Sequence, residues 1–240
     1  MNIIYRVVVG LAILQSVYAW DKVQGPPSNA EVCRRVQAYL SKNPVIIEAG
    51  TFDGTDTVEL ATLLPNAKIF TFEPVPELFD KSFHRVSAFS NITIYNLALS
   101  DTVGKAIMHL SEFNHNRGVV SASSSLLAPT GHLIYAPMIS FDRKIEVSTT
   151  TIDDWAREHN ISTIDLLKLD IQGNELNVLM ASPHALSTVK AILTEVEFAE
   201  AYKDQYLFED IKKWLEGQGF VLDCLFVDCS WFGDALFIRK

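Results

Sequence analysis

The chain contains few cysteines, and their spacing excludes the sites that cysteines usually build. Three occur in 240 residues, as Cys33, Cys224 and Cys229. They show neither metal-ligand spacing nor a redox pair, so we expect inert or core thiols. A disulfide between Cys224 and Cys229 stays open in case the protein is exported.

The chain also lacks a cluster of positive charge. Its 20 Lys and Arg residues are scattered and stand against 29 Asp and Glu residues, which gives a net charge of −9. Such a chain has no electrostatic attraction for a phosphate polymer, so we expect no nucleic-acid partner. With 48% hydrophobic and 20% charged residues, it has the composition of a globular protein. The length suits one α/β domain.

Long apolar runs are missing, apart from one near the amino terminus. Residues 7–19 are mostly apolar, but this segment is too short to span a membrane securely. It ends in small residues typical of a signal-peptidase site. Three interpretations stay open: a cleaved signal peptide, an uncleaved anchor and an ordinary apolar helix. The first two place the protein in the secretory pathway, exported or associated with a membrane through residues 3–19. A cytoplasmic location is the alternative.

The folded domain is expected to begin at Ser28. Two prolines precede this residue, and Ser28 with Glu31 forms a capping-box pattern at a helix start. Val32, Val36, Tyr39 and Leu40 then fall on one helical face. The expected division is a signal peptide or anchor (1–20), a linker (21–27) and a folded domain (28–240).

The run from Val45 to Gly54 (VIIEAGTFDG) is the most informative stretch. An apolar strand ends in Glu48 and continues into a turn at Gly50, where glycine permits a tight bend and close approach to a ligand. A second strand, 68–72, ends in Glu73. This acid lies 23 residues after Gly50, near the ~20-residue offset at which α/β nucleotide folds place a carboxylate on ribose hydroxyls.

Strand and helix patterns alternate along the first half of the chain. The expected elements are a strand at 45–49, a helix at 54–64, a strand at 68–72, a helix at 76–88, and strands at 92–98 and 104–110. Near-continuous apolar strands between helices predict a parallel sheet covered on both faces.

This alternation stops from Ser111 to Ile145, a stretch rich in Ser, Asn and His. We expect a lid or binding loop there, with disorder as the alternative. His109, His115 and His132 carry no metal-ligand spacing, and we interpret them as solvated loop residues. No metal site is predicted.

Strong patterns return after a short helix capped by Thr151. A strand at 164–169 ends in Asp170, and another at 189–194 ends in the acids Glu195 and Glu197. Because ligands of open α/β sheets bind at the carboxyl ends of strands, Asp170 should join Glu48 and Glu73 on one rim. After a helix at 206–216, the strands at 220–227 and 235–239 are too closely connected for a parallel crossover and predict a hairpin.

Together these segments resemble the FkbM type of S-adenosylmethionine-dependent O-methyltransferase, a class I methyltransferase. The segments that carry the resemblance are 45–54 (VIIEAGTFDG), 70–74 (FTFEP), 96–101 (NLALSD), 123–126 (SSSL), 150–154 (TTIDD) and 167–175 (LKLDIQGNE). The resemblance implies a doubly wound, mostly parallel seven-stranded sheet with a carboxyl-terminal antiparallel hairpin, and makes 28–240 a methyltransferase domain. The chain departs from the family at Gln172, where Glu is common, and in its amino-terminal segment.

The resemblance also implies roles for individual residues. Glu73, beside Pro74, would bind the ribose hydroxyls, and Glu48 would hold the ammonium of the cofactor. The other residues implied for S-adenosylmethionine are Gly50, Thr51, Phe52, Asp53 and Gly54 around the methionine part, and Ala98 and Leu99 beside adenine.

An acceptor hydroxyl needs a base, for which Asp170 is the first candidate and Glu175 and His115 are others. A structural or cofactor-orienting role for Asp170 is equally open. We also expect Lys168 to lower the pKa of Asp170 through its charge.

The expected function is methylation of a hydroxyl on a sugar, glycoconjugate or small molecule. One alternative is a catalytically idle, exported relative that binds a glycan or protein. A nicotinamide-dependent oxidoreductase is less favoured, because the glycines at 50 and 54 lack the three-glycine pyrophosphate pattern.

Overall fold

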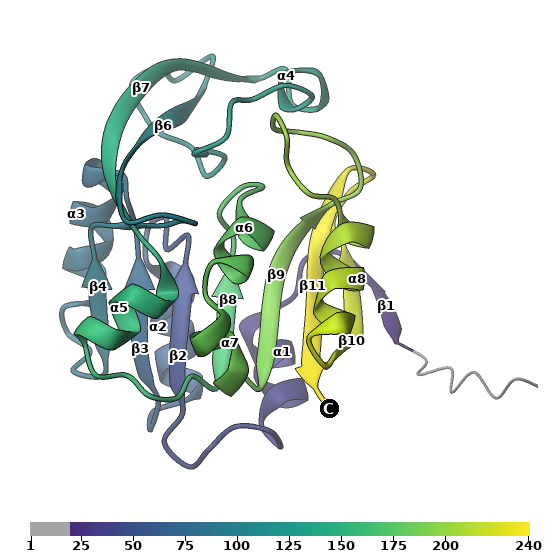
Figure 1. The fold of residues 1–240 in the computed structure, drawn as a ribbon. Helices are drawn as coiled ribbons and strands as arrows, with labels where there is room; N and C mark the ends of the chain where they lie inside the picture. The colour runs from purple at the N-terminus through teal and green to yellow at the C-terminus, as the bar shows by residue number, and fades with distance from the viewer. Residues whose placement is uncertain (1–19) are drawn as a thin grey trace, which may run out of the picture.

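The structure is a computed structural model that describes residues 20–240 (Figure 1). The segment 1–19, which carries the predicted signal peptide or anchor, lies outside the described residues, so its role and the location of the protein stay predictions. Within residues 20–240, no helix has the length and apolar character needed to cross a membrane.

The centre of the protein is an eight-stranded sheet. Its strands follow the order β1 (Asp21–Gln24), β10 (Phe220–Val227), β11 (Phe232–Arg239), β9 (Ala191–Glu197), β8 (Leu166–Leu169), β2 (Val45–Ala49), β3 (Lys68–Phe72) and β4 (Ile92–Tyr95). Only β11 runs antiparallel to its neighbours, which confirms the mostly parallel sheet with a carboxyl-terminal hairpin. The sheet has one strand more than the seven predicted, and the additional strand is β1. Because Asp21–Gln24 pairs with β10, the segment 21–27 that was predicted to be a linker begins with a strand.

Helices cover both faces of this sheet (Figure 1). One face carries α1 (Asn29–Val36), α2 (Thr55–Leu63) and α3 (Pro76–Val86), and the other carries α5 (Ile152–Glu158), α6 (Glu175–Met180), α7 (Pro183–Thr188) and α8 (Phe208–Gly217). Successive strand residues point to opposite faces. Ile46 therefore packs in the core under α1 and α2, while Ile47 packs in the core on the opposite face.

The helix after Ser28 forms as predicted but is shorter. The Ser28 side chain accepts a hydrogen bond from the Glu31 amide at 3.2 Å, so the serine half of the capping box is present. The Glu31 carboxylate instead pairs with Arg34 and Arg35. Because α1 ends at Val36, the side chain of Tyr39 is exposed rather than part of the predicted apolar face.

A second, three-stranded sheet corrects the prediction for the middle of the chain. Its order is β5 (Ala98–Leu99), β7 (Ile139–Thr150) and β6 (Gly104–Phe113), with α4 (His132–Tyr135) in the connection between β6 and β7. The predicted strand 92–98 thus divides between two sheets, and both ends of the predicted loop, 111–113 and 139–145, are strand. One face of β7 is largely exposed, and an antiparallel ribbon tolerates polar residues on such a face.

The cysteines are free thiols. Cys33 and Cys224 are buried in the core between α1 and the sheet, and Cys229 is half-buried in the hairpin connection. The disulfide between Cys224 and Cys229 that was left open is not formed.

Candidate functional site

A pocket of about 650 Å³, open to solvent, lies at the carboxyl ends of β2, β3 and β8. The small sheet arches over this edge of the main sheet (Figure 1). The side chains and turns that enclose the pocket belong to Ala49, Gly50, Phe52, Phe72, Glu73, Pro74, Val75, Leu78, Leu97, Ala98, Leu99, Met108, Ser121, Ala122, Ser124, Leu126, Asp170, Ile171, Gln172 and Asn174. Its wall is mostly apolar with a few polar groups, a composition typical of small-molecule sites.

The turn at Gly50 brings two strand ends together. Gly50 has a φ of +91°, and a Cβ added there would lie 1.9 Å from the carbonyl oxygen of Asp170. The amide of Asp170 donates to the carbonyl of Ala49 at 3.0 Å, so the two segments meet backbone to backbone. Glycine is therefore needed for the approach of β8, a role additional to the predicted approach of a ligand.

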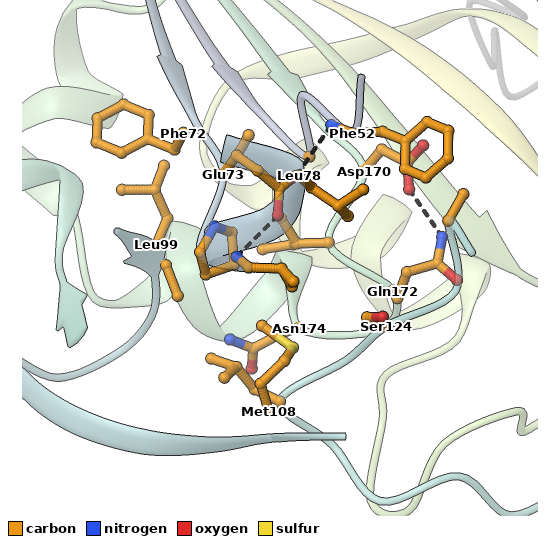
Figure 2. A pocket seen from close by; sticks show the side chains of 18 of the residues that line it. Phe52, Phe72, Glu73, Leu78, Leu99, Met108, Ser124, Asp170, Gln172 and Asn174 are labelled. Carbon is orange, nitrogen blue, oxygen red and sulfur yellow. Dashed lines mark hydrogen bonds between the residues drawn. The ribbon is translucent and has the colours of Figure 1, made fainter. Parts of the chain in front are cut away.

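Glu73 faces this pocket from the end of β3. Its Oε2 accepts a hydrogen bond from the Phe52 amide and its Oε1 accepts one from the Val75 amide, each at 2.9 Å (Figure 2). Burial raises the pKa of Glu73 to about 7, although both amide donors lower it. Each carboxylate oxygen retains a lone pair for a further donor.

Glu48 does not line the pocket. It pairs in register with Lys168 on β8 and Thr71 on β3, so these side chains point to the same face of the sheet. Glu48 Oε1 accepts from the Lys168 ammonium at 2.8 Å, and its Oε2 accepts from Thr57 at 2.5 Å and Thr71 at 3.0 Å. The expected convergence of three acids therefore holds for Glu73 and Asp170, while Glu48 belongs to a buried ion pair behind the turn.

Three other residues of the glycine-rich turn also lie outside the pocket wall. Thr51 is buried, with its hydroxyl bonded to Thr71 and to the Phe72 carbonyl. Asp53 accepts hydrogen bonds from Thr55 and pairs with Arg85 and Lys81. These contacts outweigh burial and hold the pKa of Asp53 well below its usual range. Gly54 precedes α2 in a left-handed conformation, packed against Ser82 of α3.

Asp170, the first candidate for the base, stands at the end of β8. Its side chain is accessible because it lines this pocket and a second cavity on the other side of the strand end. Desolvation of the carboxyl group by the surrounding protein raises the pKa of Asp170. A hydrogen bond from Gln172 and the charge of Lys168 act in the opposite direction. The lowering expected from Lys168 is therefore present but does not prevail.

The other two candidate bases are not at the pocket wall. Glu175 is buried under the turn, where its Oε1 accepts from the Ile171 amide at 2.8 Å, and burial raises its pKa well above the usual value. His115 is exposed in the turn after β6, with its ring against Phe113. Neither touches the space that Glu73 and Asp170 face.

The remaining wall combines predicted and missed residues. Pro74, Ala98 and Leu99 line the pocket as expected from the resemblance, together with Phe52. Sequence reasoning missed Met108 on β6 and Ser121 and Ala122 in the connection between β6 and β7. Four further residues could have been found, because they lie inside segments that carried the resemblance: Ser124, Leu126, Gln172 and Asn174. Among residues 20–240, no group of three or more His, Cys, Asp or Glu side chains is arranged to hold a metal ion.

Comparisons with known proteins found a family match and several relatives. Residues 48–222 match the family described as the Methyltransferase FkbM domain. The 2-O-methyltransferase NoeI of Sinorhizobium fredii is 31% identical over 79% of this chain and 76% of its own. The hexuronic acid methyltransferase AglP of Haloferax volcanii is 22% identical over 80% of this chain and 72% of its own. A solved structure of the N-terminal domain of EvdMO1, with SAH and D-fucose, has a TM-score of 0.49 and 10% identity over 89% of this chain and 82% of that one.

Proposed function

We propose an acceptor class for this chain, which belongs to the FkbM methyltransferase family. Membership confirms the resemblance and the methyltransferase activity, with S-adenosylmethionine as methyl donor. The acceptor that we propose is a hydroxyl group of a sugar or glycoconjugate. Relatives named as a 2-O-methyltransferase and a hexuronic acid methyltransferase support this acceptor.

The observation that carries the proposal is the placement of two carboxyl groups in one pocket. Glu73 and Asp170 both face the pocket beside Gly50, from the ends of different strands (Figure 2). One acid is thereby available to bind the cofactor and the other to act on the acceptor. Such a division of labour requires that the two acids share a cavity, as they do here.

The residues present fit the cofactor. Glu73 is held by two backbone amides, and its free lone pairs suit the two ribose hydroxyls of an adenosine. The apolar side chains of Phe72, Leu97 and Leu99 provide a wall suited to adenine. When bound, S-adenosylmethionine supplies an electrophilic methyl group on a sulfonium.

Asp170 is the residue we assign as the base. The Asp170 carboxylate would accept the proton of the acceptor hydroxyl as that oxygen is methylated, and the bound cofactor would supply the methyl group. A raised pKa makes Asp170 a stronger proton acceptor than an ordinary aspartate.

The small sheet supports this chemistry by covering the pocket. Met108, Ala122 and Leu126 line it from the segments above the main sheet. Their apolar surface limits the access of water, which favours alignment of the two reactants and avoids hydrolysis.

Two alternatives are not favoured. The family assignment does not support an oxidoreductase, and an idle relative would not need an accessible acid beside the cofactor pocket.

The test uses methyl-labelled S-adenosylmethionine and a panel of neutral methyl hexosides, N-acetylhexosaminides and uronides. We expect label in a stable methyl ether of at least one glycoside. Asp170→Asn should lose transfer by about 100-fold or more while keeping affinity for S-adenosylhomocysteine. Asp142→Asn, the same change at an exposed position of β7, is the matched control. The sugar proposal is rejected if every glycoside stays unlabelled while another acceptor class is methylated.

A further inference from the structure

We propose that Glu195 is a positioning residue that shares one proton with Asp170, and that the side-chain amide of Gln172 holds the two carboxyl groups together. This inference rests on the proposed role of Asp170 as the base. Glu195 is not among the residues that line the cofactor pocket, so it acts through Asp170.

The amide of Gln172 joins the two acids directly. Its Nε2 donates to Asp170 Oδ1 at 2.8 Å and to Glu195 Oε2 at 2.6 Å. Figure 2 shows the first of these hydrogen bonds at the pocket wall. Both carboxyl groups therefore contact one nitrogen atom, although they belong to the ends of different strands, β8 and β9.

The orientation of this amide is fixed by its other contacts. The hydroxyl of Tyr202, a fully buried residue, lies 2.7 Å from Gln172 Oε1, and the Ser125 hydroxyl donates to the Gln172 carbonyl at 2.7 Å. Gln172 is itself buried and has a φ of +57°, a conformation that a residue with a side chain seldom adopts. These contacts keep the N–H groups directed at the two acids.

The surroundings do not supply enough positive charge to keep both acids ionised. The nearby cation is Lys168, whose ammonium contacts Glu48 at 2.8 Å and Asp56 at 3.3 Å. The other titratable groups around the pair are all neutral or negative, and none brings a positive charge. They are Asp56, Glu73, Glu175, Glu197, Tyr202, Asp228 and Asp234. Two close carboxylates in such a setting retain one proton between them.

The difference in burial decides which acid holds that proton. Glu195 is 9% exposed, and burial followed by the charge of Asp170 raises its pKa well above the usual value. Both acids border the second cavity, but Asp170 is exposed and also lines the cofactor pocket, and the charge of Lys168 lowers its pKa, so Asp170 is the better site for the negative charge. Glu195 thus stays neutral while Asp170 stays ionised and directed at the acceptor.

Carbon-13 NMR of the ligand-free protein tests this arrangement without an acceptor. Glutamate labelled at its carboxyl carbon reports the Glu195 titration, and the signal is assigned by its loss in Glu195→Gln. In the wild type we expect a pKa well above 4.5, the value of an unperturbed glutamate. Asp170→Asn should lower it by about one unit or more, because a neighbouring negative charge is removed.

Two further variants distinguish direct contact with Glu195 from the effect of a more distant charge and from loosening of the fold. Asp228→Asn removes the same charge from the second cavity without touching the Gln172 amide, and should shift the Glu195 pKa by less than half as much. Gln172→Leu removes the shared donor and should raise the Glu195 pKa. General loosening of the fold would not produce shifts of opposite sign in Asp170→Asn and Gln172→Leu.

The outcomes distinguish this inference from the proposed function. A wild-type Glu195 pKa near 4.5, or equal shifts in Asp170→Asn and Asp228→Asn, would overturn proton sharing. Methyl transfer by Asp170→Asn at the wild-type rate would instead reject Asp170 as the base, and with it the positioning role of Glu195, without changing the Glu195 titration.

Discussion

Replacing Gly50 with alanine should destabilise the protein and abolish cofactor binding together. The new Cβ would lie 1.9 Å from the carbonyl oxygen of Asp170, and a φ of +91° is strained for any residue with a side chain. Ordinary contact between such atoms begins near 3.5 Å, so the ends of β2 and β8 must separate by about 1.6 Å. Overpacking and backbone strain together predict a cost of about 3–5 kcal/mol.

Gly118→Ala provides the matched control for this substitution. Gly118 has a similar φ of +89°, but an added Cβ would meet nothing within 4 Å. It should therefore show the backbone strain alone, about 1–2 kcal/mol. For a chain of this length, each kcal/mol corresponds to about 2–4 °C in Tm.

Urea unfolding and calorimetric titration with S-adenosylhomocysteine measure the two effects. Gly118→Ala should bind with wild-type affinity, whereas Gly50→Ala should show no measurable binding at a temperature where it is still folded. Normal binding by Gly50→Ala, with a stability no lower than that of Gly118→Ala, would refute the close approach of β2 and β8.

Three further predictions follow from single residues of the site. Glu73→Gln should weaken S-adenosylhomocysteine binding by about 10- to 100-fold in calorimetry, since a charged acceptor is lost. Unchanged affinity would exclude the assigned ribose contact. The control is Glu77→Gln, the same change at an exposed position of α3. Burial raises the folded pKa of Glu73 to about 7 from 4.5, so the folded state binds more protons between these pH values. The urea-derived stability of the ligand-free wild type should therefore fall by ~3 kcal/mol more than that of Glu73→Gln between pH 4.5 and 7, and equal pH dependence of the two proteins would refute this. Lys168→Met leaves the Glu48 carboxylate buried without its cation, and should lower the free energy of unfolding by about 3–5 kcal/mol in chemical denaturation. The double variant Lys168→Met with Glu48→Gln should recover much of this stability. Absence of recovery would argue against loss of the ion pair as the cause.

The strands that build the pocket were predictable because they are buried on both faces. β2 at Val45–Ala49 and β3 at Lys68–Phe72 have the predicted bounds, since a central parallel strand is an apolar run that ends where polar residues begin. The small sheet was not predictable in the same way. β7 at Ile139–Thr150 exposes much of one face, so its polar residues resemble those of a loop.

The sequence by itself determined which acids stand at strand ends, because local patterns mark where each strand stops. Only the tertiary structure decided what each acid contacts. Glu48 meets Lys168 across 120 residues of chain, and Gln172 meets Glu195 across 23. Such pairings depend on strand register and on which face each side chain takes, and a shift of one residue reverses that face. For this reason Glu73 and Asp170 share a pocket, while Glu48 stabilises the sheet behind it.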